Sequence, residues 1–327
     1  MSRYLTKKTI SVIPIAYRDE GNIRELYKRV TNELKKITPN YEIVYVNDAS
    51  PDGTQRILED LAQKDNKLTV ILHSRNFGAQ NAFTTGMKQA IGEAVVIMDG
   101  DLQDPPEMIS DFVKKWLEGY DVVYGVRRKR EKSMGWFMEQ AYHSFYVLFS
   151  KLSYIKVPAD VGDFSLMDRK VVDQLNLLPE KDRFMRGLRA WVGFKQIGIS
   201  YVRPERFSGD GVSTTSIFRG FWWARRAIFS FSYAPLEWIF YAAMVSVFAS
   251  ILAALFYIST YFLLPGAPKG FLTILIVTLF LGSIQLVVLS FISEYLRRIF
   301  EEVKSRPVSI VQEIINDHKV KRSKGRG

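Results

Sequence analysis

The 327-residue chain contains no cysteine and only three histidines. Without cysteine it can form neither a disulfide framework nor a thiolate metal site, and the scattered His73, His143 and His318 do not form a histidine zinc site. Any metal must therefore be bound by oxygen ligands. No G-x-G-x-x-G follows the first predicted strand, and no G-x-x-x-x-G-K-[ST] occurs in the chain. Both absences argue against a dinucleotide oxidoreductase or a P-loop phosphotransferase.

A secretory leader is not expected either, because the apolar residues 9–16 are interrupted by Pro14 and followed at once by Arg18, Asp19 and Glu20. What the chain does have is 47% hydrophobic residues, 13% aromatic residues and 45 Lys+Arg against 34 Asp+Glu, a formal net charge of +11. This apolar content is enough for a sizeable core and excludes a disordered chain.

Two runs carry no charge, 27 residues at 238–264 and 23 residues at 271–293. Each exceeds the roughly 20 residues that a helix needs to cross a membrane. The alternative, two buried helices of a soluble protein, is disfavoured because helices of this length are rarely fully apolar in such folds. With only six residues between them, the spans predict a hairpin with both chain ends on one side.

Lysines and arginines concentrate after the second run, whereas the loop offers only Lys269. The positive-inside rule therefore predicts a multi-pass protein of the inner (plasma) membrane with the soluble part and both termini in the cytoplasm. Beside a membrane, the basic surplus indicates attraction to anionic lipid and not to nucleic acid.

The first part of the chain alternates strand-like and helix-like segments, which predicts an α/β fold with a largely parallel sheet and helices on both faces. The predicted strands lie at residues 9–16, 41–46, 68–72, 94–98 and 121–124. Such sheets bind ligands beyond the carboxyl ends of their strands. Asp48 ends the second strand, and Asp99 and Asp101 follow the fourth. An isolated D-x-D pair is equally compatible with a solvated turn or a helix cap, but here three carboxylates converge and could hold a hard divalent cation on a diphosphate.

Four ordered motifs carry a resemblance to a known family. They are SVIPIAY at 11–17 with Glu20, VNDAS at 46–50 followed by DGT, SRNFG at 74–78 and VIMDGDLQDPPE at 96–107. Over residues 8–230 and on into the hairpin, the chain resembles the GT-A family 2 glycosyltransferases, and among them the polyprenyl-phosphate glycosyltransferases such as dolichyl-phosphate mannose synthases and bactoprenol glucosyltransferases. The resemblance implies a GT-A catalytic domain, Rossmann-like with a mostly parallel sheet.

The resemblance also implies roles for individual residues. The nucleotide sugar is expected at Pro14, Ala16, Tyr17, Glu20, Asp48 and Asp99. Mg²⁺ or Mn²⁺ is expected at Asp99, Asp101 and Gln103. Asp163, in GDFSLMD at 162–168, resembles the acid nearest the acceptor, so Asp101, Asp163 and Arg127 are the predicted catalytic residues. Asn47 and Ala49 depart from the family pattern, which weakens any role for position 47.

A lipid phosphate is largely a dianion near neutral pH, so it needs cationic docking more than a general base. The predicted ligands of the acceptor phosphate are Arg127, Arg128, Arg206 and Ser213. A solvated basic loop is the alternative for residues 127–130, and an inert surface loop is the alternative for 206–213.

Aromatic-rich segments at 136–149 and 217–231 predict amphipathic interfacial helices, with ordinary core helices as the alternative. The predicted organisation is therefore a nucleotide-sugar part at 1–132, an acceptor-side part at 133–235, two transmembrane helices at 236–296 and a basic cytoplasmic tail at 297–327.

The function that the resemblance implies is an inverting, metal-dependent transfer of a hexose onto polyprenyl phosphate, with UDP-glucose and undecaprenyl phosphate as the first choice. GDP-mannose with a dolichol-type acceptor, a processive polysaccharide synthase and a non-catalytic sensor of nucleotide sugars remain as alternatives. Exposed aromatic residues around the hairpin favour a homo-oligomer.

Overall fold

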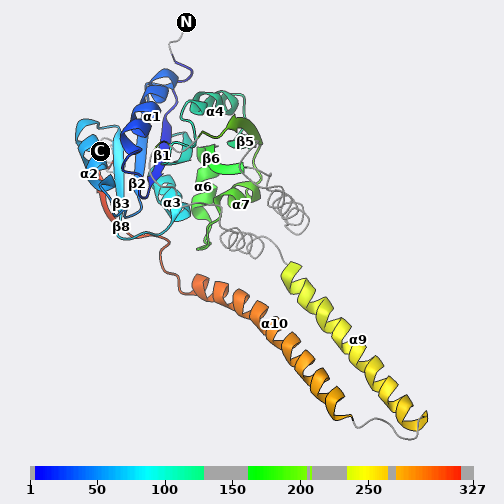
Figure 1. Ribbon diagram of the computed structural model, residues 1–327. Helices are drawn as coiled ribbons and strands as arrows, with labels where there is room; N and C mark the ends of the chain where they lie inside the picture. Colours follow the sequence, from blue (N-terminus) through cyan, green and yellow to red (C-terminus); the bar gives the residue numbers. More distant parts are fainter. Residues whose placement is uncertain (1–3, 129–160, 205–206, 208–233, 264–269, 318–327) are drawn as a thin grey trace. The chain divides into compact units, whose positions relative to one another are not determined.

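The computed structural model describes residues 4–128, 161–204, 207, 234–263 and 270–317 (Figure 1). The chain divides into two compact units. The first is an α/β unit that contains most of the first 222 residues and resumes at Pro307, and the second is a helical unit that contains Trp223–Arg306.

The α/β unit is built on one eight-stranded sheet in the order β7-β5-β6-β4-β1-β2-β3-β8. The strands are β1 Ile10–Ala16, β2 Tyr41–Asn47, β3 Leu68–His73, β4 Ala94–Asp99, β5 Val122–Arg128, β6 Val161–Asp168, β7 Gln196–Val202 and β8 Val311–Ile315. Strand β1 pairs in parallel with β2 and β4, and β2 with β3, as the alternation of segments predicts.

Strands β5 and β7 also pair in parallel, but the prediction of a mostly parallel sheet is only partly correct, because the sheet is mixed. Strand β6 runs antiparallel to β4 and β5, and β8 runs antiparallel to β3. Both strands carry polar residues, such as Asp163 and Glu313, and lack the continuous apolar run that predicts β1 to β4; β7 was not predicted either.

Helices cover both faces of this sheet. They are α1 Ile23–Ile37, α2 Thr54–Lys64, α3 Ala79–Gln89, α4 Met108–Leu117, α6 Arg169–Leu177 and α7 Met185–Trp191. Helices α1, α2 and α4 bury their apolar sides in one core cluster with alternate strand residues such as Ile43 and Tyr45. Helix α3 packs on the opposite face, where Gly86 lies close to Ile13 and Val46.

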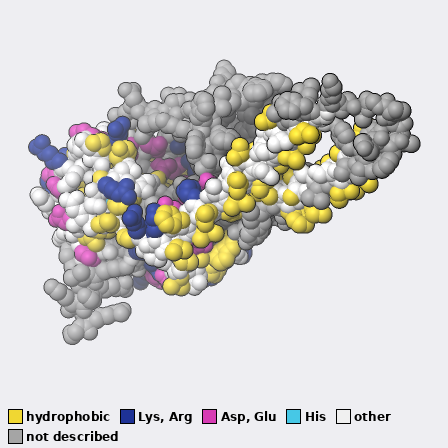
Figure 2. Space-filling view, turned by 90° about the horizontal axis from the view of Figure 1, so that it is seen from below, with side chains coloured by type: hydrophobic (Ala, Val, Ile, Leu, Met, Phe, Trp, Pro, Cys, Tyr) yellow, Lys and Arg dark blue, Asp and Glu magenta, His cyan; other side chains and the backbone are white. Residues whose placement is uncertain are grey.

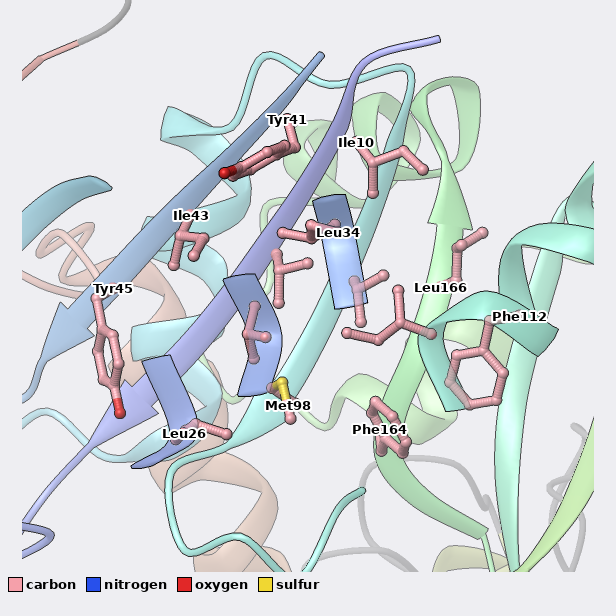
Figure 3. Packing of buried hydrophobic residues seen from close by; sticks show 14 of the residues in the cluster. Ile10, Leu26, Leu34, Tyr41, Ile43, Tyr45, Met98, Phe112, Phe164 and Leu166 are labelled. Atoms are coloured by element: carbon pink, nitrogen blue, oxygen red, sulfur yellow. The ribbon is translucent and has the colours of Figure 1, made fainter. Parts of the chain in front are cut away.

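Figure 3 shows the cluster on the first face, with Leu26 and Leu34 of α1 above the sheet. Phe112 of α4 packs on Phe164 of β6 with ring centroids 4.7 Å apart. Each fully buried side chain of this size contributes about 1.5–3 kcal/mol, as an upper estimate, so this packing stabilises the sheet.

The helical unit contains α9 Ala234–Leu263 and α10 Phe271–Val303, which confirms helices at both uncharged runs. Large apolar side chains on both are exposed, among them Phe240, Phe248 and Leu286, and Figure 2 shows hydrophobic side chains along both helices. Within the described residues, one stretch, Val277–Val303, is long and apolar enough to cross a membrane, with a mean hydropathy of 1.8. Trp238–Ala253 is a shorter apolar stretch. The two-span hairpin therefore stays a prediction.

The segment predicted as a basic tail contains the end of α10 and strand β8. Beyond β8, Asn316 donates to the carbonyl oxygens of Ala62 and Leu68 at 2.6 and 3.2 Å and accepts a bond from Thr69 Oγ1 at 2.8 Å. The part of this segment from Val311 to Asn316 is thus built into the sheet. The predicted interfacial helices at 136–149 and 217–231 lie outside the described residues.

Candidate active site

A cleft of about 250 Å³ opens at the carboxyl ends of β1, β2 and β4, beside the start of α3. Its lining consists of Ile15, Ala16, Tyr17, Asp19, Asp48, Asn76, Gly78, Ala79, Asp99, Gly100 and Asp101. It lies where ligands of α/β sheets bind. Five of the residues expected at the donor or metal line it: Ala16, Tyr17, Asp48, Asp99 and Asp101.

The other predicted donor and metal residues lie outside this lining. Pro14 is buried within β1, and Glu20 accepts a bond from the backbone N–H of Gly53 at 3.0 Å. The side-chain amide of Gln103 donates to the carbonyl of Pro204 at 3.3 Å, and its backbone N–H donates to Asp101 at 3.1 Å.

The parallel register explains why the acids meet. Asp99 is opposite Ile15 across the β1–β4 pair, and Asn47, just before Asp48, is opposite Ala16 across the β1–β2 pair. Gly100 allows the chain after β4 to pass close to β1, because a Cβ there would collide with the carbonyl oxygen of Ile15.

Negative charge accumulates beyond β4. Burial, followed by the neighbouring charges of Asp104, Asp101 and Asp163, raises the pKa of Asp99 to about 8. Burial also raises the pKa of Asp104, which accepts a bond from the Tyr201 hydroxyl at 2.6 Å. The other carboxylate oxygen of Asp104 has no hydrogen-bond partner among the described residues. Sequence reasoning missed Asp104, although it lies in the motif at 96–107 that also contains Asp99 and Asp101.

These acids fit a divalent cation. No group of three or more acidic or histidine side chains is arranged as a metal site within the described part of the chain. However, Mg²⁺ in nucleotide sites is commonly held by one or two carboxylates together with phosphate oxygens and water. The pKa of Asp99 is raised and one oxygen of Asp104 has no partner among the described residues. A cation bound here would compensate the negative charge of these carboxylates.

Asp48 has a different surrounding. Its buried carboxylate accepts bonds from the backbone N–H groups of Phe77 and Gly78 at 2.8 and 2.7 Å and contacts His73 Nδ1 at 2.8 Å. His73 Nε2 lies 3.0 Å from Thr85 Oγ1. Asp48 thus fixes the loop that begins α3 at the edge of the cleft. The role of His73 was missed, because its sequence neighbours do not indicate these partners.

Asp163, on β6, forms a second charged cluster. Its carboxylate accepts bonds from Arg186 Nε and Nη2 at 3.1 and 3.2 Å and from Gln80 Nε2 at 3.0 Å. Burial alone would raise its pKa, but the charges of Arg186 and Arg189 and these hydrogen bonds outweigh burial and lower the pKa of Asp163 below its usual value. Asp163 is therefore ionised at neutral pH.

Sequence reasoning also missed Arg186. Arg189, in the same helix, is buried and donates to the carbonyl oxygens of Gly162 and Asp163 at 3.3 and 3.4 Å. Burial lowers the pKa of Arg189 to about 10, so the group stays charged at neutral pH.

Of the predicted phosphate ligands, Arg127 is the one whose side chain the structure describes. It lies on β5, half-buried, with Nε 3.4 Å from the Tyr201 hydroxyl. Burial alone would lower its pKa, but the neighbouring Tyr201 and Asp104 raise it above its ordinary value. The backbone of Arg128 continues β5, and Arg206 and Ser213 lie outside the described residues. Arg203, another arginine predicted as a possible clamp for the acceptor phosphate, places Nη2 3.8 Å from Asp101.

Comparison with known proteins gives matches along most of the chain. The family described as glycosyl transferase family 2 matches residues 11–175. An uncharacterised glycosyltransferase of Synechocystis sp. is 39% identical over 307 residues, which cover 93% of this chain and 95% of that protein. A bactoprenol glucosyl transferase of Shigella phage SfII is 37% identical over 306 residues, covering 93% and 97%.

Among solved structures, a mannosyltransferase of Pyrobaculum calidifontis in complex with GDP-Man and Mn²⁺ is similar to this chain. It is 21% identical with a TM-score of 0.42, over 62% of this chain and 59% of that one.

Proposed function

Because the chain belongs to glycosyl transferase family 2, we propose that it transfers a hexose from a nucleotide sugar to the phosphate of a polyprenyl lipid. UDP-glucose and undecaprenyl phosphate are the proposed substrates. Relatives named bactoprenol glucosyl transferase support this choice. The observation that carries the proposal is the convergence of Asp48, Asp99 and Asp101 on one cleft at the strand ends.

On the donor side, Ala16, Tyr17 and Asp48 would contact the nucleotide, and Asp99 and Asp101 would lie at the diphosphate. Pro14 and Glu20 would support this pocket from β1 and the loop after it. Mg²⁺ or Mn²⁺, held by Asp99 and Asp101 with Gln103, would neutralise the charge of the departing nucleoside diphosphate.

On the acceptor side, the lipid phosphate would dock on Arg127, with Arg128, Arg206 and Ser213 as further ligands. A phosphate oxygen attacks the anomeric carbon, a new carbon–oxygen bond forms, and the bond to the nucleoside diphosphate breaks with inversion. A phosphate dianion has no proton to lose, so Asp163 need not act as a base. Asp163 instead holds Arg186 in place, and the fixed charges hold acceptor and donor in line.

The proposed setting is the cytoplasmic face of the inner (plasma) membrane. Helices α9 and α10 would span the bilayer as a hairpin, with both termini in the cytoplasm, and the chain would assemble as a homo-oligomer. Residues 1–132 would bind the nucleotide sugar, 133–235 would form the acceptor side, 236–296 would span the membrane and 297–327 would follow on the cytoplasmic side.

The test offers the purified full-length protein radiolabelled UDP- and GDP-hexoses, one at a time, with undecaprenyl phosphate and Mn²⁺. The expected result is one labelled sugar per lipid, extractable into organic solvent, from UDP-glucose. A product that lengthens with time would contradict single transfer. Unchanged nucleotide sugars throughout would contradict catalysis.

A further inference from the structure

The hydroxyl of Tyr201, on β7, lies between the acidic loop after β4 and the arginine of β5. It donates a hydrogen bond to Asp104 Oδ1 at 2.6 Å, and its oxygen accepts one from Arg127 Nε at 3.4 Å. Tyr201 and Asp104 are 6% and 1% exposed. A hydroxyl has one proton to donate, so the proton given to Asp104 leaves the lone pairs of the oxygen to accept from Arg127. Tyr201 thus connects the loop that carries Asp101 with the proposed ligand of the acceptor phosphate.

Packing leaves the ring of Tyr201 little room to move. Tyr201 and Arg127 are opposite each other across the parallel β5–β7 pair. The ring lies so close to the backbone of Gly125 that a Cβ there would come within 2.7 Å of a ring carbon. The ring also meets Phe164 edge-on, with centroids 6.1 Å apart, and Phe164 packs on Phe112 in the core (Figure 3). The core therefore fixes the position of the hydroxyl.

The guanidinium group of Arg127 is held from two sides. Tyr201 accepts from its Nε, and a Cβ at Gly162 would lie 2.9 Å from its Nη2 and 3.2 Å from its Cζ. The group therefore lies against the backbone of the residue before Asp163. Among the described residues, the bond to Tyr201 is the one hydrogen bond of the Arg127 side chain, so both Nη groups can donate to a phosphate.

We propose that Tyr201, held by Asp104, is a positioning residue that orients Arg127 toward the acceptor phosphate, a role that rests on the proposed function. Tyr201 itself would not touch the phosphate, because its hydroxyl already bonds Asp104 and Arg127. A planar guanidinium binds phosphate strongly only when its fork faces the phosphate oxygens. Loss of the hydroxyl should therefore weaken acceptor binding and leave donor binding unchanged.

The test removes the hydroxyl alone, with Tyr201→Phe in the full-length protein. The matched control is Tyr27→Phe on α1, which also removes a 2.6 Å hydrogen bond from a tyrosine to an aspartate, in this case Asp65. Neither Tyr27 nor Asp65 lines the donor cleft. Initial rates of hexose transfer are measured while undecaprenyl phosphate and UDP-glucose are varied in turn. Calorimetry in detergent measures the binding of geranyl phosphate, and of UDP with Mn²⁺.

We expect Tyr201→Phe to raise the KM for undecaprenyl phosphate about tenfold and to weaken geranyl phosphate binding by a similar factor, as the loss of a hydrogen bond to a charged group implies. The KM for UDP-glucose and the affinity for UDP should stay at the wild-type values. Tyr27→Phe should leave all four quantities unchanged, even where it lowers the melting temperature.

A double-mutant cycle with Arg127→Lys separates positioning from a structural role. Lysine has no Nε–H to orient, so adding Tyr201→Phe to Arg127→Lys should not raise the acceptor KM further. Additive effects, an equal rise of both KM values, or an unchanged acceptor KM in Tyr201→Phe would overturn the proposal, while an active wild type would keep the proposed function. No transfer by the wild type would contradict the proposed function, and this role of Tyr201 with it.

Discussion

Asp101 combines partial burial with a long ion pair to Arg203, at 3.8 Å. It follows β4 and supports no core packing, so its charge can be removed without loss of the fold. We predict that Asp101→Asn lowers the rate of hexose transfer by roughly 100-fold or more. The substitution removes a proposed ligand of the divalent cation that would compensate the charge of the departing diphosphate. The measurement is initial rate in the lipid-extraction assay, with circular dichroism to check folding.

The matched control for Asp101 is Asp111→Asn, on the exposed side of α4, where the carboxylate pairs with Lys114. It should retain the wild-type rate. Wild-type activity of Asp101→Asn would remove this residue from the site.

Asp99 makes stability depend on pH. Its pKa is raised from 3.8 to about 8 in the folded chain, so the protonated carboxyl favours folding. Its contribution is complete below about pH 4 and is lost as the pH rises through about 8. Without divalent cations, the melting temperature should therefore fall over this range, and Asp99→Asn should flatten the fall. Added Mg²⁺ should flatten it too. An equal slope for wild type and variant in EDTA would contradict the raised pKa.

Sequence reasoning predicted the acids at strand ends, because Asp48, Asp99 and Asp101 directly follow apolar runs. It did not find Asp104, His73 or Arg186 as contributors. Their roles depend on partners far away in the sequence: Tyr201 for Asp104, Thr85 for His73 and Asp163 for Arg186. Such pairings arise from packing between elements, which hydrophobic periodicity does not encode.

Strand β8 closes one edge of the sheet, and its last residue, Ile315, is opposite Val70 and packs against the core. We predict that Ile315→Asp destabilises the α/β unit by about 1–2 kcal/mol, since a charge replaces a half-buried apolar side chain. The measurement is urea unfolding followed by tryptophan fluorescence. Glu313→Gln, on the exposed part of the same strand, should leave the midpoint unchanged, and an equal effect of the two substitutions would argue against β8 packing.

The strands β1 to β4 could be predicted because parallel strands buried on both faces are continuously apolar. Strand β6 mixes Asp163 and Ser165 with apolar residues, and β8 is only five residues long and contains Gln312 and Glu313. Their direction could not be predicted either, because it depends on how the chain returns to the sheet. The uncharged runs at 238–264 and 271–293 correctly predicted the helices α9 and α10. The length of an apolar run alone does not establish that a helix spans a membrane.

The natural absence of cysteine provides a clean background for a topology test. Single cysteines replace Ser2, Ala267 or Ser323 in intact cells, which are treated with a membrane-impermeant maleimide. If both helices span the bilayer with the ends inside, only Ala267→Cys is labelled before lysis, and the other two react after it. Labelling of Ser323→Cys but not of Ser2→Cys from outside would mean an odd number of crossings.

The pairing of β8 with β3 places the sheet on both sides of the helical unit in the chain, before α9 and after α10. In the chain, the helical unit is therefore an insertion within the α/β unit and is joined to it at both of its ends. A protease site introduced at 264–269 should consequently yield two fragments that still purify together, because the second carries its own strand of the sheet.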